Sequence, residues 1–74
     1  MRKKMIDIIN GIHPGIDFDK EDKLFEDGII DSFDIISIIS EVSATLGISI
    51  KPEEIFPENF NSLDAIVALI ERNF

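Results

Sequence analysis

The fold is organised around the stretch DSFDIISIISEVSATL, residues 31–46. From Ile35 onward its apolar residues recur every three or four positions, as they do on one face of a helix, and Gly47 follows where a left-handed cap commonly ends one. This pattern predicts a helix over residues 32–46. Its first residue is Ser32, and the free backbone N–H groups at a helix N-terminus favour a bound anion such as phosphate.

This helix is expected to carry two apolar surfaces. At about 100° per residue, with Ile35 as the reference, one stripe falls within about 60° and is predicted to be buried. The stripe consists of Ile35, Ile38, Ile39, Val42 and Leu46. Phe33 and Ile36 fall at about 160° and about 100°, so both are predicted to point away from the core and to form a docking patch. The alternatives are that Phe33 folds back under the preceding loop, or that both are ordinary isolated apolar residues on a surface.

Two further helices are predicted, one towards each end of the chain. The first spans residues 2–12, where four apolar residues recur at helical spacing: Met5, Ile8, Ile9 and Ile12. The last begins after Asn61 or Ser62, either of which can cap it. Its apolar stripe consists of Leu63, Ile66, Val67, Ile70 and Phe74. Both stripes are expected to pack against the other helices.

The segment between the second and last helices is predicted to contain only short turns. Residues 48–50 alternate like a strand, but no second strand exists to pair with them, so we interpret them as a connector. Pro52 and Pro57 each suit the first position of a short helical turn. Three side chains of this segment are expected to be buried in the core: Ile55, Phe56 and Phe60.

Residues 14–30 are predicted to form a long loop, which is uncommon in a small domain unless it is functional or packed by its own side chains. The side chains expected to pack it are Phe18, Leu24, Phe25, Ile29 and Ile30. Asp19 is expected to cap one turn over residues 20–23. A calcium-loop register starting at Asp17 fails, because the sixth-position glycine is Asp22 and the twelfth-position glutamate is Gly28. We predict a solvated acidic loop with no metal site beyond weak cation binding.

The composition limits the protein to one small domain, residues 1–74, with 45% hydrophobic residues and no cysteine. A multi-domain enzyme, disulfides and a cysteine-based metal site are thereby excluded. The formal charge of −8 disfavours nucleic acid, because only residues 2–4 form a basic group. No segment reaches the ~20 apolar residues of a membrane span. Residues 2–4 resemble the basic start of a signal peptide, but the run that follows is short, contains Asp7 and lacks a small-residue cleavage site. We expect a cytoplasmic monomer without membrane insertion.

No catalytic constellation is evident, so we predict that the chain is not an enzyme. His13 is the only histidine. We interpret it as a solvated residue at the end of the first helix, where it suits the negative end of the helix dipole. No Ser-His-Asp grouping, glycine-rich phosphate loop or conspicuous buried carboxylate pair accompanies it. A carrier or a binding protein is the remaining class.

The run LFEDGIIDSFD, residues 24–34, resembles the phosphopantetheine attachment site of acyl carrier proteins, in which an Asp-Ser-hydrophobic triplet opens the second of four helices. The resemblance extends from the first helix to the region of Ser62 and Leu63. It implies an all-α fold, a small four-helix bundle with three main helices, a short third helix and a long first loop.

By this resemblance, a phosphopantetheinyl transferase joins 4'-phosphopantetheine from coenzyme A to Ser32, giving a flexible arm whose thiol holds acyl or aminoacyl groups as thioesters. A loading ligase and a downstream transferase or synthase are the other implied partners. Asp31 would position the serine and contribute charge for docking. Phe33 and Ile36 match the apolar docking positions of the family, and Asp34 and Glu41 would attract basic residues of partners.

The chain departs from the carriers of fatty acid synthesis, whose second helix is usually more acidic. Here Ser37, Ser40, Ser43 and Ala44 occupy most of that surface. The sequence is more similar to stand-alone carriers of dedicated lipid, secondary-metabolite or cell-wall pathways, including D-alanyl and other aminoacyl carriers, and the cargo stays open. The alternative function is an unmodified helical interaction module that uses the Phe33 and Ile36 patch to bind a basic amphipathic helix.

Overall fold

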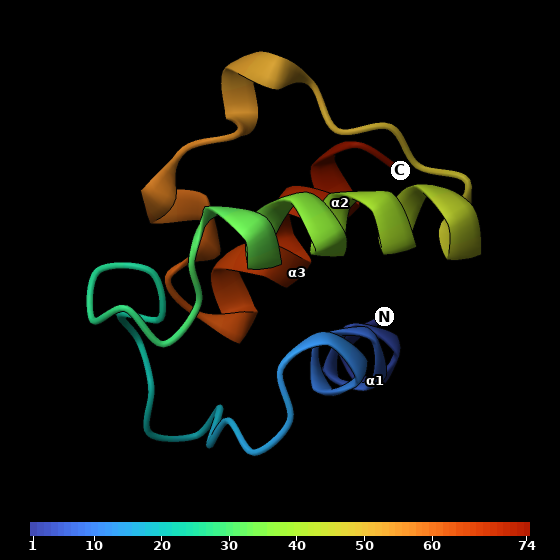
Figure 1. Cartoon of the computed structure of the whole chain (residues 1–74). Helices are drawn as coiled ribbons and strands as arrows, with labels where there is room; N and C mark the ends of the chain where they lie inside the picture. The colour runs from blue at the N-terminus through green and yellow to red at the C-terminus, as the bar shows by residue number, and fades with distance from the viewer.

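The computed structural model describes residues 1–74 and contains three α-helices, two 3-10 turns and no strand (Figure 1). The elements are α1 (Arg2–Ile12), α2 (Ser32–Leu46), η1 (Pro52–Glu54), η2 (Pro57–Phe60) and α3 (Leu63–Arg72). The all-α prediction is confirmed, with two 3-10 turns in the place of the short third helix. Residues 48–50 belong to no helix or strand, as expected of a connector.

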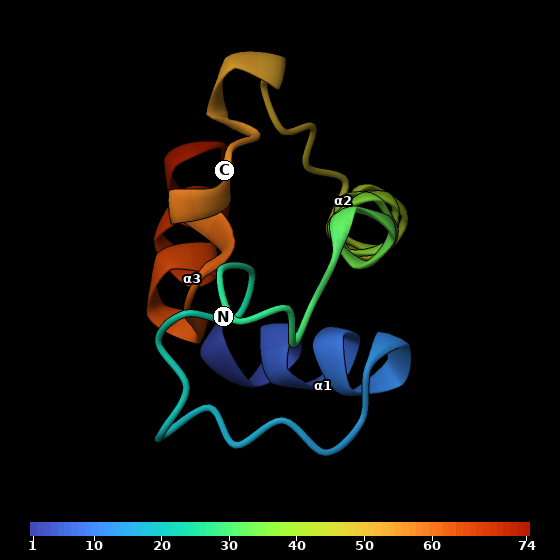
Figure 2. The same cartoon turned by 60° about the vertical axis from the view of Figure 1, so that its left-hand side comes forward.

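The three helices enclose an entirely apolar core. Figure 2 looks nearly along α2 and shows α3 on the opposite side, with α1 running across below both. The 14 buried residues are Met5, Ile9, Leu24, Ile30, Ile35, Ile38, Val42, Ile48, Ile50, Phe60, Leu63, Ile66, Leu69 and Ile70, and none of them is polar. Burial of aliphatic side chains is therefore the main stabilising contribution in a chain that has no disulfide.

The structure confirms the predicted faces of α2. Ile35, Ile38 and Val42 are buried, and the two other members of the stripe are partly buried against the same core. Phe33 is 80% exposed and Ile36 is 60% exposed, so the alternative in which Phe33 folds back under the loop is wrong. The helix ends at Gly47, whose φ of +68° is readily adopted only by a residue without a Cβ.

The loop between α1 and α2 packs through its own apolar side chains, as predicted. Leu24 and Ile30 are fully buried, and the Ile30 N–H donates to the Leu24 carbonyl oxygen at 3.0 Å. The turn expected at Asp19 is organised by Asp17 instead. The side-chain Oδ1 of Asp17 accepts from the Asp19 N–H, and the backbone carbonyl of Asp17 accepts from the N–H groups of Lys20 and Glu21.

Asn61 and Ser62, both considered as caps of the last helix, have different roles. Ser62 caps α3, with its Oγ 3.0 Å from the Ala65 nitrogen. Asn61 holds the first loop through its backbone and its side chain. Its backbone carbonyl accepts from the Leu24 N–H at 2.7 Å, and its side-chain Oδ1 accepts from the N–H groups of Phe25 and Glu26 at 3.1 Å each. The start of α3 is thus joined to the loop that leads into α2.

Three predictions about the core were wrong. Ile55 and Phe56 are 39% and 43% exposed, whereas Phe60 is buried as expected. They belong to a segment, residues 51–59, that arches between the end of α2 and the start of α3 and that we call the arch (Figure 2). Phe74 follows the end of α3 and is 81% exposed, while Leu69, absent from the predicted stripe, is fully buried because the buried face of α3 is wider than the stripe.

Candidate functional site

Ser32 is the first residue of α2 and follows a reciprocal cap. Asp31 Oδ1 accepts from the Asp34 N–H at 3.0 Å, and Asp34 Oδ2 accepts from the Asp31 N–H at 3.1 Å. This capping box satisfies the N–H of Asp34 and fixes the direction in which the chain enters the helix. The cap therefore determines how Ser32 is presented.

Two backbone donors beside the serine remain free. The N–H groups of Ser32 and Phe33 donate to no protein group, and both residues are exposed. They lie in the first turn of α2, at the positive end of its dipole. A phosphate ester on the Ser32 hydroxyl fits this environment, because unpaired donors and the dipole both stabilise negative charge there.

An apolar groove of about 270 Å³ begins at Ser32. Its lining comes from three segments: Phe25 of the first loop, Ser32, Ile35 and Ile36 of α2, and Ile55, Phe56 and Pro57 of the arch. Ser32 is the only polar residue among them. Ile55 and Phe56 were not expected to line this groove, because nothing in the sequence around this apolar pair indicates which part of the structure it contacts.

The residues predicted to bind partners do not all gather around Ser32. Ile36 lies in the groove, and Phe33 and Asp31 are exposed beside it. Asp34 is partly buried, completes the cap and lies 3.6 Å from Nδ1 of His13, at the end of α1. Glu41 is exposed but lies elsewhere, in a hollow that it shares with residues of α1.

His13 has a defined neighbour as well as the expected place at the end of α1. It is the C-terminal cap residue, and its N–H donates to the Ile9 carbonyl at 2.7 Å. Its side chain is 40% exposed, which agrees with the predicted solvated position, while the Asp34 contact connects α1 to the cap of α2.

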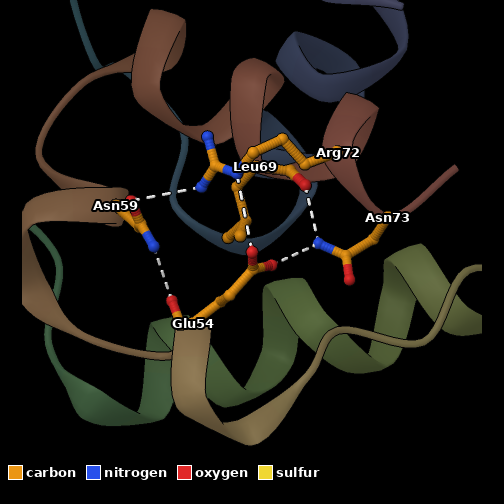
Figure 3. Close-up of polar contacts among 5 residues, drawn as sticks. All are labelled: Glu54, Asn59, Leu69, Arg72 and Asn73. Carbon is orange, nitrogen blue, oxygen red and sulfur yellow. Dashed lines mark hydrogen bonds and ion pairs between the residues drawn. The ribbon is translucent and has the colours of Figure 1, made fainter.

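A polar cluster at the end of α3 holds the arch (Figure 3). Asn73 Nδ2 donates to Glu54 Oε2 at 2.5 Å and to the Leu69 carbonyl at 2.9 Å. Arg72 Nε lies 3.5 Å from Glu54 Oε1, and Asn59 Nδ2 donates to the Glu54 carbonyl at 2.7 Å. The hydrogen bond from Asn73, together with the positive charge of Arg72, lowers the pKa of Glu54.

The structure contains no group of three or more His, Cys, Asp or Glu side chains placed to hold a metal ion. None of its helices combines the length and the apolar character needed to cross a lipid bilayer.

Comparison with known proteins gives one family and a set of relatives. Residues 5–70 match the family model described as the phosphopantetheine attachment site. The D-alanyl carrier protein of Lactococcus lactis subsp. cremoris (strain MG1363) is 36% identical over an alignment of 74 positions that includes 96% of this chain and 92% of that protein. The D-alanyl carrier protein of Lactococcus lactis subsp. lactis (strain IL1403) is 35% identical with the same coverage.

Proposed function

We propose, since this chain belongs to the phosphopantetheine attachment-site family, that Ser32 is the residue to which the prosthetic group is joined. The family makes the chain a carrier domain whose cofactor is phosphopantetheine. The observation that carries the choice of residue is the position of Ser32: an exposed hydroxyl at the start of α2, next to two unpaired N–H donors.

The attachment is a phosphoryl transfer from coenzyme A. The Ser32 oxygen attacks the phosphorus that bears pantetheine, the bond from that phosphorus to the bridging oxygen of the pyrophosphate breaks, and adenosine bisphosphate leaves. The serine proton passes to a base of the phosphopantetheinyl transferase, which also supplies the metal ion. The carrier contributes the Ser32 hydroxyl, on a backbone that the Asp31 cap fixes, and donors that stabilise the phosphodiester.

The bound arm supplies a thiol, which this cysteine-free chain lacks, and that thiol carries the cargo as a thioester. We propose a D-alanyl or similarly small aminoacyl cargo, placed on the arm by a ligase and removed by a downstream transferase. The relatives named as D-alanyl carrier proteins support this choice, and so does an α2 surface that presents serines where fatty-acid carriers present acids.

The test is the intact mass of the protein after co-expression with a phosphopantetheinyl transferase. We expect one phosphopantetheine to be added to the wild type and none to Ser32→Ala. Ser40→Ala, which removes another exposed serine of α2, is the matched control and is expected to be modified fully. Addition that persists in Ser32→Ala would show that another residue is the attachment site.

The cargo is tested on protein isolated from its native cell. A further mass increase that hydroxylamine removes would identify a thioester, and its size would identify the acyl group. An increase over the phosphopantetheinylated protein that corresponds to one alanyl group supports the proposal, whereas an increase that corresponds to a long acyl chain contradicts it.

A further inference from the structure

The arch is the one long segment between helices that contributes nothing to the core. Ile50 and Phe60, which flank it, are buried, but no residue from 51 to 59 is. Ile55 and Phe56 instead face the groove at Ser32. A surface segment without buried apolar side chains opens easily, so something other than core packing has to hold it in this position.

The polar cluster of Glu54, Arg72 and Asn73 supplies that restraint. Glu54 directly precedes Ile55. One oxygen of its carboxylate accepts a hydrogen bond from the Asn73 amide, and the other forms an ion pair with Arg72. Asn73 is itself fixed, because it also donates to the Leu69 carbonyl of the preceding turn. The end of α3 thus holds Glu54 (Figure 3), which directly precedes Ile55 and Phe56 in the chain.

The position of Ile55 and Phe56 matters for any enzyme that acts on Ser32. Ser32 lines the same groove as these two residues, so an enzyme that brings a phosphoryl donor to its hydroxyl has to cover the groove wall as well. A wall that is already in place lowers the cost of ordering the interface on binding.

We propose that Glu54, Arg72 and Asn73 are positioning residues for the attachment site: they hold Ile55 and Phe56 beside Ser32 as part of the surface that the phosphopantetheinyl transferase binds. This inference rests on the proposed function of Ser32. The cluster acts through the arch and touches neither the serine nor the reacting atoms.

The experiment compares Glu54→Ala with Glu53→Ala. Both remove one carboxylate from the same 3-10 turn, but Glu53 is exposed and its side chain makes no hydrogen bond or ion pair, which makes it a matched control. Glu54→Ala is expected to raise the KM of the transferase for the carrier by about fivefold or more with kcat within about twofold, because a binding surface is disturbed and the chemistry is not. Glu53→Ala should keep the KM of the wild type.

A second measurement reports on the arch itself. Amide hydrogen exchange of residues 51–59 is expected to be faster in Glu54→Ala than in Glu53→Ala, while exchange within α1 and α2 stays unchanged. Glu54→Gln, which keeps an oxygen for the Asn73 amide, should recover much of the wild-type KM. Because Glu54 and Arg72 are both partly exposed, no buried charge is left unpaired and the variants are expected to fold.

The outcomes separate this inference from the proposed function. If the wild type is modified at Ser32 and Glu54→Ala shows the same KM and the same exchange as Glu53→Ala, the positioning role is wrong and the attachment site stands. If the wild type is not modified at Ser32, the proposed function is wrong and the inference falls with it.

Discussion

Ser32, Phe33 and Asp34 are consecutive residues whose side chains serve different purposes. Ser32 presents an exposed hydroxyl, Phe33 is 80% exposed, and Asp34 turns back to complete the cap. Successive residues of a helix are separated by about 100°, so one turn distributes its side chains over different directions. For the same reason, substitutions at these neighbouring positions are expected to have separable effects.

At this scale the cap gives a prediction for stability. Asp31→Ala removes the oxygen that accepts from the Asp34 N–H, and we expect the free energy of unfolding to fall by about 1 kcal/mol, as measured by urea denaturation. Asp27→Ala is the matched control, because it removes the same charge from an exposed side chain that makes no hydrogen bond. Equal stabilities of the two variants would contradict the role of the cap.

Among the elements, the join between α3 and the first loop depends on one side chain. Asn61 Oδ1 accepts from two successive N–H groups, those of Phe25 and Glu26, and the neighbouring Leu24 is fully buried. The Phe25 contact is partly buried, so water replaces this acceptor poorly. Asn61 thereby helps to place Phe25 at the edge of the groove.

We therefore predict that Asn61→Ala lowers the free energy of unfolding by about 1–3 kcal/mol, because two donors lose their acceptor. The measurement is again urea denaturation. Asn61→Asp keeps the Oδ1 acceptor, loses an amide donor that makes no hydrogen bond in the structure and adds one negative charge. At a salt concentration that screens this charge, its stability should stay within about 1 kcal/mol of the wild type. An unchanged free energy of unfolding in Asn61→Ala would show that the loop is held by its apolar side chains alone.

Over the whole molecule, charge is distributed unevenly. Residues 17–34 contain eight acidic and two basic residues, a sum of −6 in a chain of net charge −8. The ion pairs of the structure are Arg2–Asp64 and Arg72–Glu54, and the one other contact of this kind is that of Asp34 with His13, so neither lysine of this segment is paired with an acid. Repulsion among these carboxylates is consequently relieved mainly by solvent and counterions.

The corresponding prediction is that added NaCl or Mg²⁺ raises the melting temperature, since counterions screen the repulsion that opposes folding. The measurement is a thermal denaturation series at increasing salt concentration. The melting temperature of a variant with Glu26→Gln and Asp27→Asn should rise less steeply with salt concentration, because two exposed charges of the segment are absent. Melting temperatures that do not move with salt would count against this account.

Features that depend on neighbours along the chain follow from the sequence. The bounds of α2, its buried stripe, the exposure of Phe33 and Ile36, and the left-handed cap at Gly47 all agree with the predictions. The position of Ser32 as the first residue of the helix agrees as well. Helical periodicity and capping act over three or four residues, so a local pattern contains enough information to predict them.

The groove and the restraints around it depend on residues that are far apart in the chain. Asn73 reaches Glu54 across 19 positions, and Asn61 reaches Phe25 across 36. Ile55 and Phe56 were predicted to be buried because they are apolar, but they are exposed, since their position is set by how the arch is held against α3. Local patterns thus account for the helix and the serine at its start, whereas the surface around that serine results from long-range contacts, whose partners no short stretch of sequence specifies.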